Sequence, residues 1–221
     1  MAGMSQIFAR VGLAIRRTRF GILLMGCAYA TGLIVGIVSA HMGHRPTLAF
    51  RDRIVSEAQA SSPILRHSRE GHPIVAAGLD FVGNLVGATA TAAAGWWAPA
   101  PLPVAIYRGW IGGIVSVDSK RRSRFRATEG GLYYALVVTL QLIAYILAGG
   151  AGVNLGLART QPRPEYRGSR LLGVPTEALR DAAYMYVLVI PIFAFASTLE
   201  FLWQDVPDQL FARCSLTLFR L

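Results

Sequence analysis

The chain has 221 residues, of which 53% are hydrophobic and 15% charged, and its mean hydropathy is +0.44. This apolar fraction exceeds that of ordinary soluble domains. The net charge of +10 does not indicate nucleic-acid binding, because the Lys and Arg residues cluster at the ends of apolar stretches, where anionic lipid headgroups lie. Two cysteines, Cys27 and Cys214, provide neither a disulfide framework nor a metal-binding spacing.

Residues 1–19 are predicted to form an amphipathic helix. Its apolar side chains recur on one helical face: Met4, Ile7, Phe8, Val11 and Ile15. Arg10 and Arg17 lie off that face. An amphipathic segment that carries arginine and adjoins a membrane span typically lies in the plane of the interface. We therefore expect an interfacial helix at the N-terminus.

Five apolar segments follow, and they predict an all-α membrane protein with a transmembrane bundle over residues 20–204. The expected spans are about 20–42, 74–96, 102–117, 131–158 and 182–204. A helix needs about 20 apolar residues to cross a bilayer. Segment 102–117 is shorter, so it either crosses as a short helix or forms a re-entrant hairpin with the second span. The run 20–42 is longer than a signal-peptide core, which argues against cleavage after Ala40.

The connections between the spans are predicted to differ in character. The loop 43–73 is long for a structureless connection, and its residues 47–60 alternate charged and apolar positions as a short surface helix does. The loop 160–179 is rich in Arg and Pro and should be largely irregular. Residues 205–221 are predicted to form a second amphipathic segment, either interfacial or docked on a partner.

Small residues recur at four-residue spacing inside the apolar segments. In lipid, such residues let helix backbones approach closely, so that packing and weak hydrogen bonds hold the helices together. We predict helix-packing roles for ten of them: Gly32, Gly36, Gly83, Gly87, Gly95, Gly109, Gly113, Ala148, Gly152 and Gly156.

Polar groups inside a bilayer are costly, so each one requires a reason. The predicted intramembrane polar residues are Asp80, Asn84, Arg108, Gln141, Asn154 and Glu200. Asp80 and Asn84 are four residues apart and share a helical face, and Arg108 could pair with Asp80 or Glu200. Two interpretations remain open. Closed pairs would act as internal struts, whereas convergence on one water-accessible cavity would indicate a transport path.

The fourth span contains the most distinctive stretch, residues 144–156 with the sequence AYILAGGAGVNLG. Together with Asn84, residues 107–113 (YRGWIGG) and residues 196–200 (ASTLE), it resembles the stage II sporulation protein M family over roughly residues 75–204. The resemblance implies five membrane-spanning helices in a bacterial inner membrane. It also implies a scaffold for other membrane proteins or a permease partner of an export system.

The sequence departs from the pattern of that family at its ionisable positions. Where the family has a His-Gly-x-x-Glu run before the Gly-rich segment, this chain has Val137, Val138 and Gln141. Asn154 stands where the family often has arginine, and Gly83-Asn84 replaces a doubled asparagine. The small-residue packing face is intact while the charge is lost, as expected for a structural subunit.

These features predict a non-enzymatic, multi-pass subunit that scaffolds or stabilises a larger membrane complex, with a permease-like component of an export or transport system as the alternative. No catalytic motif is present in the sequence, and no cofactor or metal is expected. The expected partners are other integral membrane subunits and anionic lipid headgroups. The basic loops nearly balance, and the arginines before residue 20 favour a cytoplasmic N-terminus.

Overall fold

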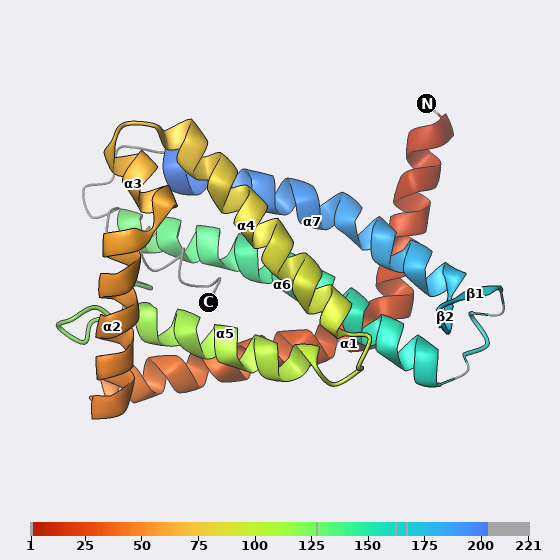
Figure 1. Ribbon diagram of the computed structural model, residues 1–221, viewed down its shortest axis with the longest axis horizontal. Coiled ribbons are helices and arrows are strands. Elements are labelled where there is room, and N and C mark those ends of the chain that lie inside the picture. The colour runs from red at the N-terminus through yellow and green to blue at the C-terminus, as the bar shows by residue number, and fades with distance from the viewer. Residues whose placement is uncertain (1, 127, 162, 167, 203–221) are drawn as a thin grey trace.

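A computed structural model describes residues 2–126, 128–161, 163–166 and 168–202. In these residues the chain forms seven helices and one short hairpin (Figure 1). The elements are α1 Ala2–His41, α2 Arg45–Ser61, α3 Pro63–Arg69, α4 Pro73–Ala94, α5 Pro101–Val115, α6 Glu129–Thr160, β1 Arg170–Leu171, β2 Val174–Pro175 and α7 Thr176–Leu202. The predicted tail 205–221 and the last two residues of the predicted span 182–204 lie outside the described residues.

Four of the helices are long and apolar enough to cross a membrane: Ser5–His41 within α1, α4, α6 and α7. This agrees with the predicted class of helical membrane protein. α5 has 15 residues, which is fewer than the roughly 20 that a span requires. Four of the helices that follow α1 have a proline as their first or second residue, where the fixed φ angle suits a first turn and the missing N–H has no partner to lose.

α1 joins the predicted interfacial helix and the first predicted span into one continuous helix of 40 residues. No proline interrupts it, so nothing removes a backbone hydrogen bond at the expected boundary near residue 19. Its N-terminal part, drawn in red, stands across the long axis of the bundle (Figure 1). There Val11 and Ala14 are buried, and Ala14 packs against Met185 of α7, whereas Ile7 and Phe8 are exposed.

α2 stands across the opposite end of the bundle (Figure 1). Its buried residues Thr47, Arg51 and Ile54 recur at helical spacing, and Ile54 packs against the C-terminal end of α5. The remaining face of α2 is largely exposed. α2 thus covers the surface helix predicted over residues 47–60. In the predicted irregular segment 160–179, the described residues between α6 and α7 form regular structure only in β1 and β2.

The helix directions alternate along the chain. Asn84 of α4 contacts Tyr145 of α6, and Gly95 at the end of α4 lies against Gly152 further along α6, so these two helices are parallel. The segment between them must therefore return to the starting end of the bundle, and α5 makes this return alongside α1 (Figure 1). α7 runs opposite to α4 and α6 (Figure 1).

α1 and α5 pack through glycines on both helices. Gly32 and Gly36 of α1 face Gly109 and Gly113 of α5. A Cβ atom added to Gly36 would lie 2.9 Å from the Cα atom of Gly113, and one added to Gly113 would lie 2.9 Å from the Cα atom of Gly36. No side chain fits between the two backbones, which is the arrangement that spaced small residues permit between membrane helices.

A second close contact joins the end of α4 to α6. Gly95 and Ala92 lie against the backbone of Gly152, and Gly156 lies against the segment after α4, where an added Cβ would be 2.7 Å from the backbone nitrogen of Ala98. Ala148, one turn earlier on α6, is fully buried in the main apolar cluster. Gly83 is half-buried on α4.

Candidate functional site

A hydrogen-bonded network joins α4, α6 and α7 in the interior of the bundle. Asp80 Oδ2 accepts hydrogen bonds from Asn84 Nδ2 at 2.8 Å and from Ser197 Oγ at 2.5 Å. Asn84 Oδ1 accepts a hydrogen bond of 2.9 Å from the Tyr145 hydroxyl. None of these four residues exposes more than 1% of its surface. We call Asp80, Asn84, Tyr145 and Ser197 the central network.

Arg108 of α5 touches this network through an aromatic face and does not pair with a carboxylate. Its guanidinium lies over the Tyr145 ring, 5.1 Å from the ring centroid. No ion pair joins it to Asp80 or Glu200 in the described ranges, so the predicted pairing is not observed. The side chain is 9% exposed, and its Nη1 atom is buried without a hydrogen-bond partner. A cation above an electron-rich ring face gains part of the stabilisation that an anion would supply.

Gly87 makes room for this arginine. A Cβ atom at Gly87 would lie 3.2 Å from Arg108 Nη2 and 3.4 Å from the Tyr145 hydroxyl. The predicted helix-packing glycine therefore faces a side chain of α5 and not the backbone of another helix. The small residue admits the large guanidinium between α4 and α6.

The other predicted polar residues form separate contacts. Gln141 Nε2 of α6 donates a 2.9 Å hydrogen bond to Glu200 Oε2 of α7, and both residues are 1% exposed. Asn154 lies nearer the other end of α6, where its Nδ2 donates to the Tyr166 hydroxyl and its Oδ1 accepts from Arg163. The six predicted residues thus fall into three groups: Asp80, Asn84 and Arg108 at the central network, Gln141 with Glu200, and Asn154 nearer the other end of α6.

The contacts of Asn154 continue into a network at the end of the bundle near β1 and β2. The Tyr166 hydroxyl donates to Asp181 Oδ2 at 3.0 Å, and Arg17 lies 3.5 Å from the same oxygen. Arg17 also lies over the Tyr166 ring. Burial, together with the neighbouring Asp181, raises the pKa of Tyr166 to about 12 against the opposing effects of Asn154 and Arg17. The hydroxyl therefore stays protonated and able to donate.

A pocket of about 470 Å³ opens at the opposite end, between α2 and the segment that connects α5 to α6. Its charged lining residues are Arg51, Asp52, Asp118, Arg122, Arg124 and Arg126. Arg51 is almost wholly buried, and its Nη1 atom donates to the backbone carbonyls of Val117 and Asp118 at 3.1 and 3.0 Å. This arginine fixes the connecting segment against α2.

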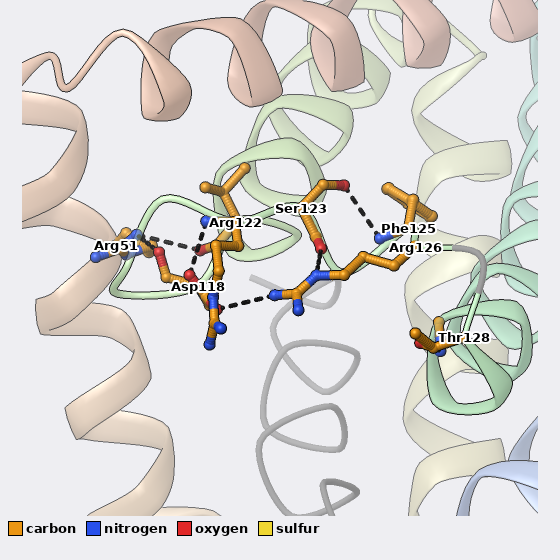
Figure 2. A network of polar contacts seen from close by, with 9 residues as sticks. Arg51, Asp118, Arg122, Ser123, Phe125, Arg126 and Thr128 are labelled. Atoms are coloured by element: carbon orange, nitrogen blue, oxygen red, sulfur yellow. Dashed lines mark hydrogen bonds and ion pairs between the residues drawn. The ribbon is translucent and has the colours of Figure 1, made fainter.

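Asp118 organises the arginines of that segment, as Figure 2 shows. Its Oδ2 atom accepts from Arg122 Nε at 2.9 Å and from Arg126 Nη2 at 3.2 Å, and its Oδ1 atom accepts from the Arg122 backbone N–H. Partial burial opposes ionisation of Asp118, but the hydrogen bonds from Arg122 outweigh it and hold the pKa of the carboxyl below its usual value.

Several residues of these networks were not singled out in the sequence. Tyr145 and Ser197 lie inside apolar runs, and Tyr166 lies in a loop, so periodicity gives them no distinct signal. Asp181 immediately precedes the predicted span 182–204, whereas α7 begins six residues before that span, at Thr176. Ser197 precedes Glu200 by three residues and therefore shares its helical face. This spacing was a signal in the sequence that could have identified Ser197.

Across the described residues, no three His, Cys, Asp or Glu side chains are grouped to hold a metal ion. No protein-family model, curated protein or solved structure matches this chain. The fold and the interior contacts define the class: a helical bundle with four helices able to span a membrane and with buried polar links between them.

Proposed function

We propose that this chain is a non-enzymatic, multi-pass membrane subunit that scaffolds or stabilises a larger membrane complex. The observation that carries the proposal is that four of the interior polar residues are buried and are hydrogen-bonded across helices within the chain. Asp80, Asn84, Gln141 and Glu200 are each at most 1% exposed, and each of them forms a hydrogen bond with a side chain on another helix of the same chain. Struts of this kind hold helices in register, whereas a transport path needs polar groups that water can reach.

The alternating helix directions support five crossings, with α5 as the short third one. α5 measures about 22 Å at 1.5 Å per residue, and the segments on either side of it add length beyond the helix. The N-terminal part of α1 and the helix α2 would then lie at opposite membrane surfaces, since each stands across one end of the bundle (Figure 1). We place the N-terminus in the cytoplasm of a bacterial cell, on the basis of the arginines that precede residue 20.

The resemblance to the stage II sporulation protein M family supports the scaffold role. The family-like stretch 144–156 contributes to close contacts at Gly149, Gly150, Gly152 and Gly156, which face α1, α4 or the segment after α4. The positions at which the family pattern is ionisable carry Gln141 and Asn154 here, and both are engaged in hydrogen bonds within the chain. The glycines of this stretch and the two polar residues therefore all make contacts within the chain.

Cysteine accessibility tests this proposal against the permease-like alternative. In a background with Cys27 and Cys214 replaced by serine, Ser197→Cys should resist a membrane-impermeant thiol reagent from both sides of the membrane, because residue 197 is 1% exposed and faces Asp80 of α4. Ser56→Cys on the exposed face of α2 is the control and should label readily. Rapid labelling at residue 197 would favour a water-filled path and the permease-like component.

The partner is identified by purification of the intact, tagged chain from its native membrane in a mild detergent, followed by quantitative mass spectrometry. Stoichiometric recovery of at least one other integral membrane protein is the expected result. A solitary chain would contradict the scaffold proposal and make Arg108, with its unpartnered Nη1 atom, the first residue to test for transport.

A further inference from the structure

The pocket between α2 and the segment that connects α5 to α6 is lined by charged residues that the proposed scaffold role does not require. It is lined by four arginines, Arg51, Arg122, Arg124 and Arg126, and by two acids, Asp52 and Asp118. Four positive and two negative side chains leave a net charge of two positive units around a volume of about 470 Å³. A concave site with a few convergent charged groups is the usual form of a small-ligand site.

The two acids are engaged by arginines of the same pocket. Asp52 accepts from Arg51 Nη2 at 2.7 Å, and Asp118 accepts from Arg122 and Arg126. The side chain of Arg122 is 55% exposed and that of Arg126 is 42% exposed, and each guanidinium has N–H donors beyond those that bond to Asp118 and Ser123. Each guanidinium carries five N–H donors in a planar fork, a geometry that matches the oxygens of phosphate.

The pocket also includes the start of α6. Thr128 caps this 32-residue helix by accepting from the Gly131 N–H, and Thr128, Gly130 and Gly131 all line the pocket. The N-terminus of a helix carries a partial positive charge and backbone N–H groups that favour anions. Gly131 lets the backbone of Arg124 and Arg126 pack directly against this turn. The helix start therefore adds to the positive field of the arginines.

We infer that this pocket binds a phosphate group, carried either by the headgroup of an anionic lipid or by a small soluble molecule. The inference stands independently of the proposed scaffold role. The position of the pocket fits a headgroup, because α2 stands across the end of the bundle and Tyr133 and Tyr134 of α6 line the pocket. Tyrosines are enriched at the depth of lipid headgroups, and basic side chains there attract anionic lipids.

The test uses the full chain purified in detergent, with native mass spectrometry of bound lipid and thermal unfolding as readouts. The probes are phosphatidylglycerol, phosphatidylcholine and inorganic phosphate. Arg122→Gln/Arg126→Gln removes two pocket arginines and should weaken binding of the phosphate-bearing probe about tenfold or more, since a hydrogen bond to a charged group is worth at least that ratio. The matched control is Arg53→Gln/Arg66→Gln, two exposed arginines of α2 and α3 that do not line the pocket.

A second variant keeps every charge and fills the space. Ser56 is exposed on α2 and lines the pocket, so Ser56→Trp should also weaken binding, whereas the control pair should not. A pocket-dependent preference for phosphatidylglycerol over phosphatidylcholine identifies a lipid headgroup. Stabilisation by inorganic phosphate that both pocket variants remove, without a lipid preference, identifies a soluble ligand. Equal binding of all probes by the unmodified chain, both pocket variants and the control overturns the inference.

Discussion

Gly36→Leu is expected to prevent stable packing of α1 against α5. The leucine side chain would start at a Cβ atom 2.9 Å from both the Gly113 Cα and the Ile114 backbone nitrogen, so that α5 must move as a whole. Overpacking lowers the free energy of unfolding by about 1–3 kcal/mol where neighbouring side chains can move aside. Here the neighbouring atoms are backbone and cannot move in that way, so we expect the free energy of unfolding to fall by more than about 3 kcal/mol. This is a large part of the free energy of unfolding of folded proteins, which is roughly 5–15 kcal/mol.

The measurement is size-exclusion chromatography and thermal unfolding of the purified variant in detergent. Gly36→Leu should aggregate or unfold far below the temperature of the unmodified chain. Gly26→Leu on the same helix is the matched control, because nothing lies within 4 Å of a Cβ atom at Gly26. A sharp elution peak and an unchanged unfolding temperature for Gly36→Leu would show that α1 and α5 do not meet at these glycines.

Asn84→Leu is expected to have the second largest effect, through the central network. The substitution removes the Nδ2 donor from Asp80 and the Oδ1 acceptor from the Tyr145 hydroxyl at once. An unsatisfied buried polar group costs about 1–3 kcal/mol and a charged one more, so a loss of about 2–4 kcal/mol is expected. Because Asn84 is 1% exposed, water cannot replace either bond.

Thermal unfolding in detergent measures this loss, and a second substitution tests its cause. Asp80→Asn in the Asn84→Leu background replaces the carboxyl group that has lost its Asn84 donor, and it should recover part of the stability. Thr31→Leu, at an exposed position of α1, is the control for adding a leucine to an apolar helix. If Asp80→Asn lowers stability further, the loss does not arise from the carboxylate.

The sequence was informative where a single helix decides the geometry. Asp80 and Asn84 were expected to share a face because they are four residues apart, and the structure joins them at 2.8 Å. Hydropathy and length likewise identified the long helices, since each span depends on its own composition. The alternating helix directions and the position of α2 across the bundle could not be predicted in this way. They depend on contacts between distant segments, which the periodicity of one segment does not encode.

Arg108 illustrates why partners across the bundle could not be predicted. The glycines of α5 that pack on α1, Gly109 and Gly113, fix the rotation of α5 about its own axis, and this rotation aims Arg108 at the Tyr145 ring. The charge of Arg108 alone suggested a carboxylate partner. The basic pocket presents the same difficulty, because Arg51 and Asp118 are separated by 67 residues in sequence and meet through a backbone carbonyl.

The short α5 has a consequence for how the chain enters a membrane during synthesis. Arg108 is the eighth of its 15 residues, and an arginine at a helix centre costs about 2.5–3.5 kcal/mol on insertion by the translocon. In the five-crossing arrangement proposed above, α5 would partition poorly alone, but α1 leaves the ribosome first and presents Gly32 and Gly36 as a docking groove. In that arrangement biogenesis would depend on the order of the segments, and a chain synthesised without α1 is expected to leave α5 outside the bilayer.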